Sequence, residues 1–419
     1  GRSLSLKLIK ELREGSLNNP QHPSAGPKFQ YSYLTELKLT ESIRYAGGDP
    51  VEDWLNKLLC MDELNVPTIE YTQLCSAKDC ELFYVSRDTL FSYHKVAEMF
   101  LQNMTALFVS SHYKNSPNDL QMMADAPAHH LYVLLPSSTI NKSSFPQILC
   151  CVQVCFEGGI SQKTVSNNFG RGQRASGDLI PWTISQQFCE ADFASLKGVR
   201  IVRIATHPDY TQMGYGTKAM ELLIDYYEKG IVTIDSPLVS PENIEDTTNI
   251  NLMEERLVPK ITLPPLLINI RERPVEQLDY IGVSYGLTPR LLKFWKRLNF
   301  VPIYLRQTPN ELTGEFTNIM IRPIKSKNSP QNNNWLAEYY FDFRTRFMSL
   351  LSYGFRDLSP SVALSLMYHD DIPLLFKSKI IFIFKIYQTM KLIIYCRRTI
   401  LNDLKIMPII WLISILLWI

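Results

Sequence analysis

The feature that most constrains the fold of this 419-residue chain is an apolar strand that leads through a glycine turn into an amphipathic helix. Residues 199–206 are apolar and β-branched, which predicts a strand, and residues 218–229 carry apolar side chains at helical spacing. Between them, Gly214 and Gly216 leave the backbone free of side chains. The N–H groups of the first helical turn would then face an anion at the positive end of the helix dipole. The pattern predicts a cradle for the diphosphate of a coenzyme.

The spacing of the two glycines narrows the choice of coenzyme. A Walker loop needs Gly-Lys-Ser or Gly-Lys-Thr after its second glycine, and a Rossmann turn needs three glycines. Neither pattern occurs here. Residues 211–216 resemble instead the acetyl-CoA loop of the GNAT acetyltransferases, which has Gln or Arg, two residues, Gly, one residue, and Gly or Ala. Thr211 occupies the first slot and Gln212 comes one position late. A plain tight turn into a helix is the alternative interpretation of an isolated Gly-x-Gly.

Further motifs extend this resemblance over residues 1–370. Together they resemble one family, the RNA cytidine acetyltransferases, which make N4-acetylcytidine in tRNA and in 18S rRNA. The resemblance implies acetyl-CoA-dependent acetylation of the N4 amine of cytidine, a role in ribosome biogenesis and tRNA modification, and a location in the nucleus and nucleolus. A protein lysine acetyltransferase and an inactive RNA-binding or ribosome-assembly remnant stay open as alternatives. The motif segments are residues 110–120, 126–130, 175–182, 282–288, 289–297 and 305–310.

The resemblance also implies the fold class, an α/β fold with a GNAT-type mixed sheet flanked by helices over residues 131–325. Residues 1–120 would be the C-terminal part of a RecA-like helicase module, and residues 326–370 the start of a helical, RNA-binding region. Residues 371–419 form a hydrophobic and basic tail that diverges from the family pattern. An acidic, polar stretch at 230–265 is expected to be a surface insertion. Strands are expected at 131–135, 148–156, 199–206, 266–270, 303–306 and 318–323, and helices at 53–60 and 87–112.

Candidate site residues follow from the chemistry and from the resemblance. The exocyclic amine of cytidine is a weak nucleophile, so a general base is useful, and histidine suits that role near neutral pH. The resemblance points to His112, and His207 is the rival because it ends a strand, with a strand cap as its alternative role. N–H groups near the strand end could receive the charge that grows on a thioester oxygen. The resemblance places acetyl-CoA contacts at Ile204, Ala205, Thr206, Thr211, Gln212, Met213, Gly214, Tyr215, Gly216, Thr217 and Arg297.

Two other kinds of bound group are not expected in this chain. ATP serves the full-length family, but the Walker motif of its ATPase lobe occurs nowhere in this sequence. Among eight cysteines, Cys150, Cys151 and Cys155 lie on one expected strand, where neighbours point to opposite faces. Cys75 and Cys80 are the only other close pair, which is too few ligands for zinc. We therefore expect no metal site and free thiols.

RNA binding has to come from local patches, because the net charge of the chain is only +2. The resemblance implies rRNA and tRNA as partners, with guide RNAs or an adaptor protein as further candidates. The target cytidine must be unpaired, since pairing with guanine occupies its amine. Residues 169–175 combine Arg and Gly as a backbone-gripping loop would, and residues 335–352 interleave aromatic and Arg side chains, for which a helix core is the alternative. The apolar runs at 380–384 and 409–419 fall short of the roughly 20 residues of a membrane span, so no stable membrane association is expected.

Overall fold

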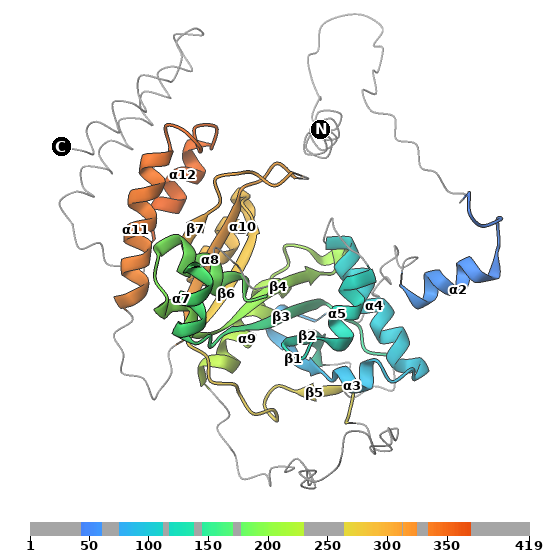
Figure 1. The fold of residues 1–419 in the computed structure, drawn as a ribbon. Helices are drawn as coiled ribbons and strands as arrows, with labels where there is room; N and C mark the ends of the chain where they lie inside the picture. The colour runs from blue at the N-terminus through green and yellow to red at the C-terminus, as the bar shows by residue number, and fades with distance from the viewer. Residues whose placement is uncertain are drawn as a thin grey trace, which may run out of the picture. The chain divides into compact units, whose positions relative to one another are not determined.

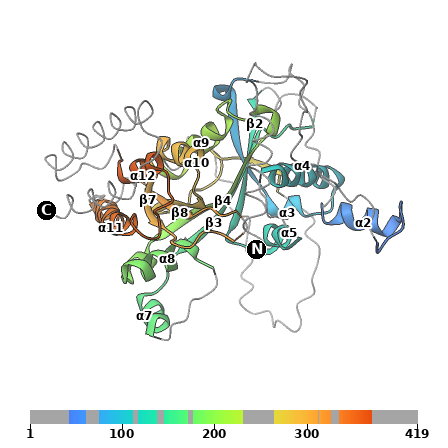
Figure 2. The same ribbon diagram turned by 90° about the horizontal axis from the view of Figure 1, so that it is seen from above.

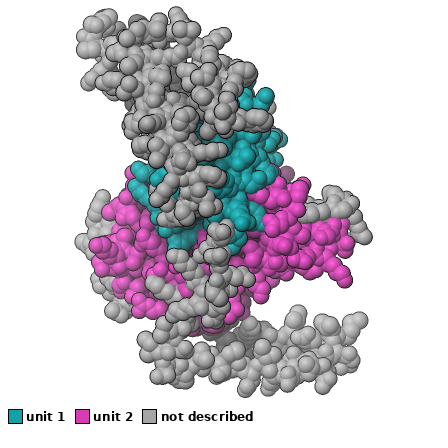
Figure 3. Space-filling view, turned by 90° about the vertical axis from the view of Figure 1, so that its left-hand side faces the viewer, with its two compact units in different colours: residues 1–35, 284–322, 330–419 teal, residues 36–283, 323–329 magenta. Residues whose placement is uncertain are grey.

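The structure, a computed structural model, describes residues 43–60, 75–111, 117–137, 145–170, 177–229, 264–311, 313–324 and 334–369 of the chain. The chain divides into two compact units, which Figure 3 shows in different colours. The larger unit comprises residues 36–283 and 323–329, and the smaller unit comprises residues 1–35, 284–322 and 330–419. The expected domain boundaries at residues 120, 131, 325 and 370 stay predictions.

The larger unit is built on a mixed sheet, as the sequence predicts (Figure 1). Its strands are ordered β5-β1-β2-β3-β4-β6. Neighbouring strands are antiparallel except β4 and β6, which run parallel. The strands are β1 (Cys80–Val85), β2 (His129–Pro136), β3 (Cys150–Gly158), β4 (Lys197–Thr206), β5 (Leu267–Asn269) and β6 (Tyr280–Gly286), whose last three residues belong to the smaller unit.

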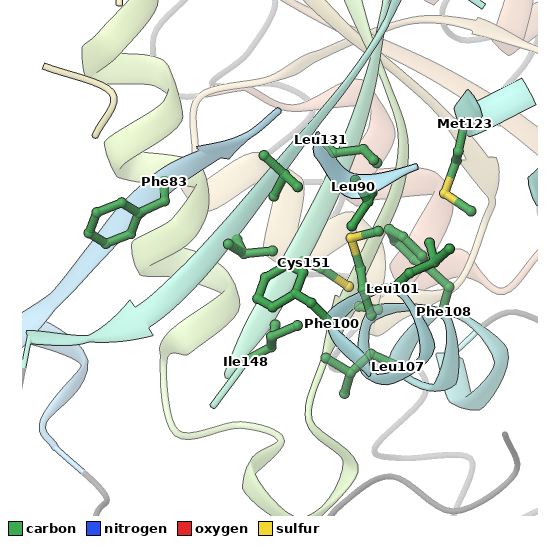
Figure 4. Packing of buried hydrophobic residues seen from close by; sticks show 14 of the residues in the cluster. Phe83, Leu90, Phe100, Leu101, Leu107, Phe108, Met123, Leu131, Ile148 and Cys151 are labelled. Atoms are coloured by element: carbon green, nitrogen blue, oxygen red, sulfur yellow. The ribbon is translucent and has the colours of Figure 1, made fainter. Parts of the chain in front are cut away.

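Strand periodicity divides the side chains of this sheet between two faces. On β2, Leu131, Val133 and Leu135 point into a buried cluster with helices α4 (Lys95–Ser111) and α5 (Pro117–Asp125), which Figure 4 shows. On the other face, the Tyr132 hydroxyl lies 3.1 Å from the hydroxyl of Tyr227 on helix α9 (Tyr215–Lys229). Helices therefore cover both faces of the sheet, and α9 lies opposite α4 (Figure 2).

The motif at 175–182 has a structural role in the larger unit. Asp178 adopts a left-handed conformation (φ 44°), and its carboxylate accepts a hydrogen bond from the Gly158 N–H at 2.8 Å. This contact ties the start of α8 (Leu179–Phe188) to the end of β3, and Trp182 is buried against Val165 and Ala194. The remaining short elements of this unit are α2 (Pro50–Leu58), η2 (Ala77–Asp79), α3 (Arg87–Leu90), α7 (Gln162–Gly170), α8 (Leu179–Phe188), η3 (Asp192–Ser195) and η4 (Pro208–Tyr210).

The smaller unit contains the end of β6 with strands β8 (Thr317–Pro323) and β7 (Val301–Leu305), in the order β6-β8-β7. Its helices are α10 (Pro289–Arg297), α11 (Asn334–Leu350) and α12 (Pro360–Met367). Aromatic side chains form much of its interior: Trp295 lies 5.1 Å from Phe300 between ring centroids, and Phe347 lies 5.4 Å from Phe355. α11 packs against β7.

Most of the predicted strands are confirmed within a few residues, and two strands were missed. The sequence did not predict β1 or β6. Gly282 lies inside β6 and lowers its strand propensity, and a Cβ there would require the end of the Ile180 side chain to shift. The predicted helix at 87–112 is split into α3 and α4, and Tyr93 between them has a positive φ of 62°. Nearly all of the expected insertion at 230–265 and the tail at 371–419 lie outside the described residues.

Candidate active site

The end of β4 forms one side of the candidate site. The parallel pairing of β4 with β6 extends from Gly198 to Ile201, where Ile201 lies opposite Val283. The antiparallel pairing with β3 continues as far as Thr206. The last residues of β4 therefore extend past the segment that pairs with β6. Among the described residues, the edge of β4 that faces away from β3 has no paired strand there.

The direction of the N–H groups at this edge follows from one hydrogen bond. The His207 N–H donates to the Leu149 carbonyl at 2.9 Å. Because alternate residues of an antiparallel strand face the same neighbour, the N–H of Ala205 points toward β3. Those of Ile204 and Thr206 point away from it. Of the three predicted strand contacts, two therefore offer outward donors, whereas Ala205 contributes a buried side chain.

The glycine turn and the start of α9 supply a second set of donors. Gly214 has a φ of 91°, a conformation that favours glycine, and its carbonyl accepts the first helical bond, from the Lys218 N–H at 2.9 Å. In the part of the chain that the structure describes, the N–H groups of residues 214–217 have no hydrogen-bond partner. No acidic side chain lies in the first turn of α9 to neutralise its dipole. These N–H groups suit the oxygen atoms of a diphosphate, and the coenzyme contacts expected at these residues stay predictions.

The turn also packs closely on β4. A Cβ on Gly216 would lie 3.1 Å from the hydroxyl oxygen of Thr206, so the first turn of α9 and the end of β4 are held near each other. Thr211, Gln212 and Met213 are exposed, and Gln212 is left-handed (φ 66°). The outward N–H groups of β4 and those of α9 thus lie at one end of the same strand–turn–helix unit.

His207 is placed differently from an exposed catalytic base. Its side chain is buried, and its Nδ1 accepts a hydrogen bond from the Asp209 N–H at 3.4 Å at the start of η4. Its ring lies 5.0 Å from that of Tyr210. These contacts are those of a strand-end cap.

His112 lies outside the described residues, but the segments on either side of it are described and both contact Arg203 of β4. The Arg203 guanidinium lies 5.9 Å from the Phe108 ring centroid, and its Nη2 lies 2.8 Å from Asp119 Oδ1. Arg203 directly precedes Ile204, the first of the candidate coenzyme contacts. Sequence reasoning overlooked Arg203 and Asp119, although the two arginines within this mostly apolar strand, Arg200 and Arg203, were a usable signal.

Arg297 lies in the smaller unit, at the exposed end of α10, on a pocket of about 530 Å³ between α10 and α12. Lys293 and Lys296 line the same pocket, and none of the described residues that line it is a carboxylate. The Lys296 ammonium donates to the Ser365 carbonyl at 2.8 Å and to the Tyr368 carbonyl at 2.6 Å. Among the described residues, the side chains of Lys293 and Arg297 have no hydrogen-bond or ion-pair partner. The pocket is therefore basic and suited to an anionic group.

The predicted RNA-binding segments are described only in part. Of the aromatic side chains at 335–352, Tyr340, Phe343 and Phe347 are buried in the core of the smaller unit, whereas Trp335 and Tyr339 are half-buried. Beyond the end of α7, the loop predicted at 169–175 lies outside the described residues.

Neither a metal-ligand cluster nor a membrane-spanning helix is found within the described ranges. Cys150, Cys151 and Cys155 are buried free thiols on β3. Within those ranges, no group of three or more His, Cys, Asp or Glu residues is placed to hold a metal ion. None of the helices with assigned positions is long and apolar enough to cross a membrane.

Comparison with known proteins decides the family. Residues 103–325 match the family described as GNAT acetyltransferase 2, and residues 1–62 match the helicase domain of RNA cytidine acetyltransferase NAT10/TcmA. The RNA cytidine acetyltransferase of Homo sapiens is 49% identical over 414 residues, which cover 95% of this chain. The chain belongs to the RNA cytidine acetyltransferase family. Residues 335–398 match a third family, described as "Possible tRNA binding domain".

Other members of the RNA cytidine acetyltransferase family agree with this assignment. The Saccharomyces cerevisiae member is 49% identical over 88% of this chain, and the Dictyostelium discoideum member is 47% identical over 89% of it. The chain spans only 40% of the human relative's length and 37% of each of the other two. The match to a solved structure of Arabidopsis thaliana NAA60 in complex with acetyl-CoA covers 59% of this chain and 99% of the NAA60 chain. The two are 8% identical, with a TM-score of 0.32.

Proposed function

We propose that this chain transfers the acetyl group of acetyl-CoA to the N4 amine of cytidine in RNA. The observation that carries the proposal is the convergence of two sets of outward N–H groups, at Ile204 and Thr206 of β4 and at residues 214–217 of α9. The names of the family relatives, which are RNA cytidine acetyltransferases, support the choice of cytidine as acceptor. We further propose rRNA and tRNA as substrates and the nucleolus as the place of action.

The N–H groups of residues 214–217 would hold the diphosphate of acetyl-CoA, because donors without partners at a helix N-terminus suit phosphate oxygens. When bound, acetyl-CoA supplies an acetyl group activated as a thioester. The N–H groups of Ile204 and Thr206 would donate hydrogen bonds to its carbonyl oxygen, where negative charge grows during transfer. The remaining proposed contacts, at Thr211, Gln212, Met213 and Arg297, rest on the family resemblance.

The proposed general base is His112, which would take a proton from the cytidine amine. Its two described flanks contact Arg203, one residue before the proposed carbonyl-binding edge of β4. His207 is the alternative base, but its buried side chain already caps η4, so we assign it the role of holding the end of β4 in place.

RNA would be bound through local basic surfaces, since the chain as a whole is nearly neutral. The pocket beside Lys293 is one candidate for a phosphate of the RNA backbone. Residues 335–398 match the family described as "Possible tRNA binding domain", which supports this part of the chain as an RNA-binding region. Guide RNAs and an adaptor protein stay further candidates as partners.

The test is transfer of radiolabelled acetyl to tRNA, to a small-subunit rRNA hairpin and to lysine-containing peptides, followed by nucleoside analysis of the RNA. We expect label on cytidine and a loss of about 100-fold or more in rate with His112→Ala, the usual worth of a general base. His207→Ala should lower stability more than it lowers the rate per folded molecule. Label on peptides alone would refute the proposal in favour of lysine acetylation, and label on neither would favour an inactive remnant.

A further inference from the structure

Two cysteines of the larger unit, Cys75 and Cys80, lie side by side at the start of β1. Both are free thiols, and their Sγ atoms are 3.3 Å apart. The short helix η2 folds the chain back between them, and its cap, Ser76, accepts a hydrogen bond from the Lys78 N–H at 3.4 Å. A disulfide has a sulfur–sulfur distance of about 2.0 Å. Bond formation therefore requires only a short approach of the two sulfur atoms.

This thiol pair borders the candidate coenzyme cradle. The hydroxyl of Tyr215, the first residue of α9, donates a hydrogen bond to the Cys75 carbonyl at 2.8 Å. Ala77, in η2, lies 3.8 Å from the position that a Cβ on Gly214 would occupy. Tyr215 is buried, so its ring cannot move without displacing its surroundings. Through these contacts, a shift of residues 75–80 would displace residues 214 and 215 and so change the positions of the N–H groups of residues 214–217.

We propose that Cys75 and Cys80 form a reversible disulfide with a peroxide as oxidant, and that this disulfide weakens coenzyme binding at the adjacent cradle. The second half of the proposal rests on the proposed function, whereas the first half does not. In reducing compartments, disulfides are characteristically transient and redox-sensing. A disulfide between Cys75 and Cys80, with one of the two sulfur atoms partly exposed, fits the transient, redox-sensing kind.

The chemistry balances with hydrogen peroxide as the oxidant. The Cys75 sulfur attacks one peroxide oxygen, so that a sulfur–oxygen bond forms, the oxygen–oxygen bond breaks, and the thiol proton leaves with the other oxygen as water. The Cys80 sulfur then attacks the Cys75 sulfur, a disulfide forms, and the oxygen leaves with the Cys80 proton as a second water. Two thiols are oxidised and one peroxide is reduced to two waters.

The surroundings of the two thiols fit Cys75 as the thiol that attacks the peroxide and Cys80 as the thiol that then attacks Cys75. Cys75 is half-buried and reachable by a small oxidant, whereas Cys80 is buried. Burial, and then the hydrogen bond with Cys75, raise the pKa of the Cys80 thiol, which makes it the resolving partner rather than the first nucleophile. A metal site is the competing role for a cysteine pair, but no third ligand joins this one among the described residues.

The first experiment maps disulfides by mass spectrometry of the full chain after treatment with hydrogen peroxide, with and without later reduction. The wild type and Cys189→Ser, which removes an exposed thiol elsewhere, should both show a link between residues 75 and 80. Cys75→Ser should not, and dithiothreitol should reverse the link. A wild-type chain that forms no such link, or links these residues to other cysteines instead, would overturn the proposed site.

The second experiment measures the cradle itself, by hydrogen exchange of the amides at 214–220 and by calorimetric titration with acetyl-CoA. Oxidation should speed exchange in this segment and weaken acetyl-CoA binding about fivefold, roughly the worth of one hydrogen bond. Neither change should occur in Cys75→Ser. Unchanged exchange in the oxidised wild type would overturn the coupling. A reduced wild type that binds no acetyl-CoA would count against the proposed function instead, because the exchange readout needs no coenzyme.

Discussion

At the scale of single residues, the site depends on backbone groups more than on side chains. Gly214 has a φ of 91°, and the backbone conformation of this turn sets the direction of the N–H groups of residues 214–217. We expect Gly214→Ala to strain the turn by about 1–3 kcal/mol and to weaken acetyl-CoA binding about tenfold, measured by calorimetry. Gly47→Ala is the matched control, since a Cβ there meets nothing within 4 Å, and it should bind like the wild type. Equal affinities for the two variants would contradict the assignment of this turn.

A second residue-scale prediction concerns His130, whose side chain is largely buried beside Arg273 on the larger unit's sheet. Burial, and then the charge of Arg273, lower the pKa of His130 to about 4. A histidine with a lowered pKa in the folded state is protonated first in the unfolded chain. The contribution of neutral His130 to the free energy of unfolding is therefore fully present above about pH 6.5 and is lost as the pH drops toward 4. At pH 5 the loss from this group is about 2 kcal/mol.

The check is urea unfolding at pH 7 and pH 5. His130→Gln should lose less stability between the two pH values than the wild type does. His94→Gln, which changes an exposed histidine, should keep the wild-type difference. An identical pH dependence in His130→Gln and the wild type would show that His130 does not titrate as its surroundings indicate.

At the scale of elements, the aromatic side chains of α11 differ in burial although they share one helical spacing. The sequence could not separate core from RNA-stacking positions, because both roles place aromatic residues at helical spacing. In the structure Phe347 is buried against Phe355, whereas Trp335 is half-buried. Phe347→Ala should cost about 3–5 kcal/mol of stability in a denaturant melt. Trp335→Ala should cost clearly less, and a larger loss for Trp335→Ala than for Phe347→Ala would contradict this packing.

Helix α10 offers a second test at this scale, through its N-cap. The Thr288 hydroxyl oxygen accepts a hydrogen bond from the Leu291 N–H at 3.3 Å. Thr288→Ala should therefore lower the free energy of unfolding by about 1 kcal/mol. Ser359 occupies the same position on α12, but its side chain makes no cap hydrogen bond, so Ser359→Ala should cost less. Equal losses in the two variants would show that the cap bond contributes nothing.

At the scale of the whole molecule, local periodicity and glycine placement predicted the strand–turn–helix unit, and the family resemblance predicted the fold class. The sequence did not reveal β1 or β6, nor the contact of Arg203 with Asp119, because those depend on partners far along the chain. The same limit hid the approach of Cys75 to Tyr215, which are 140 positions apart. The motif at 175–182 has a structural role, since Asp178 ties the start of α8 to the end of β3, and Gly282 of the motif at 282–288 lies close to the Ile180 side chain.

The most direct test of the cradle is a hydrogen-exchange map of the chain with and without acetyl-CoA at a saturating concentration. We predict added protection at residues 204 and 206 and at residues 214–217, because bound oxygen atoms would accept hydrogen bonds from N–H groups that have no partner there among the described residues. Protection confined to other segments, or none at all despite measurable binding, would contradict the placement of the coenzyme on β4 and α9.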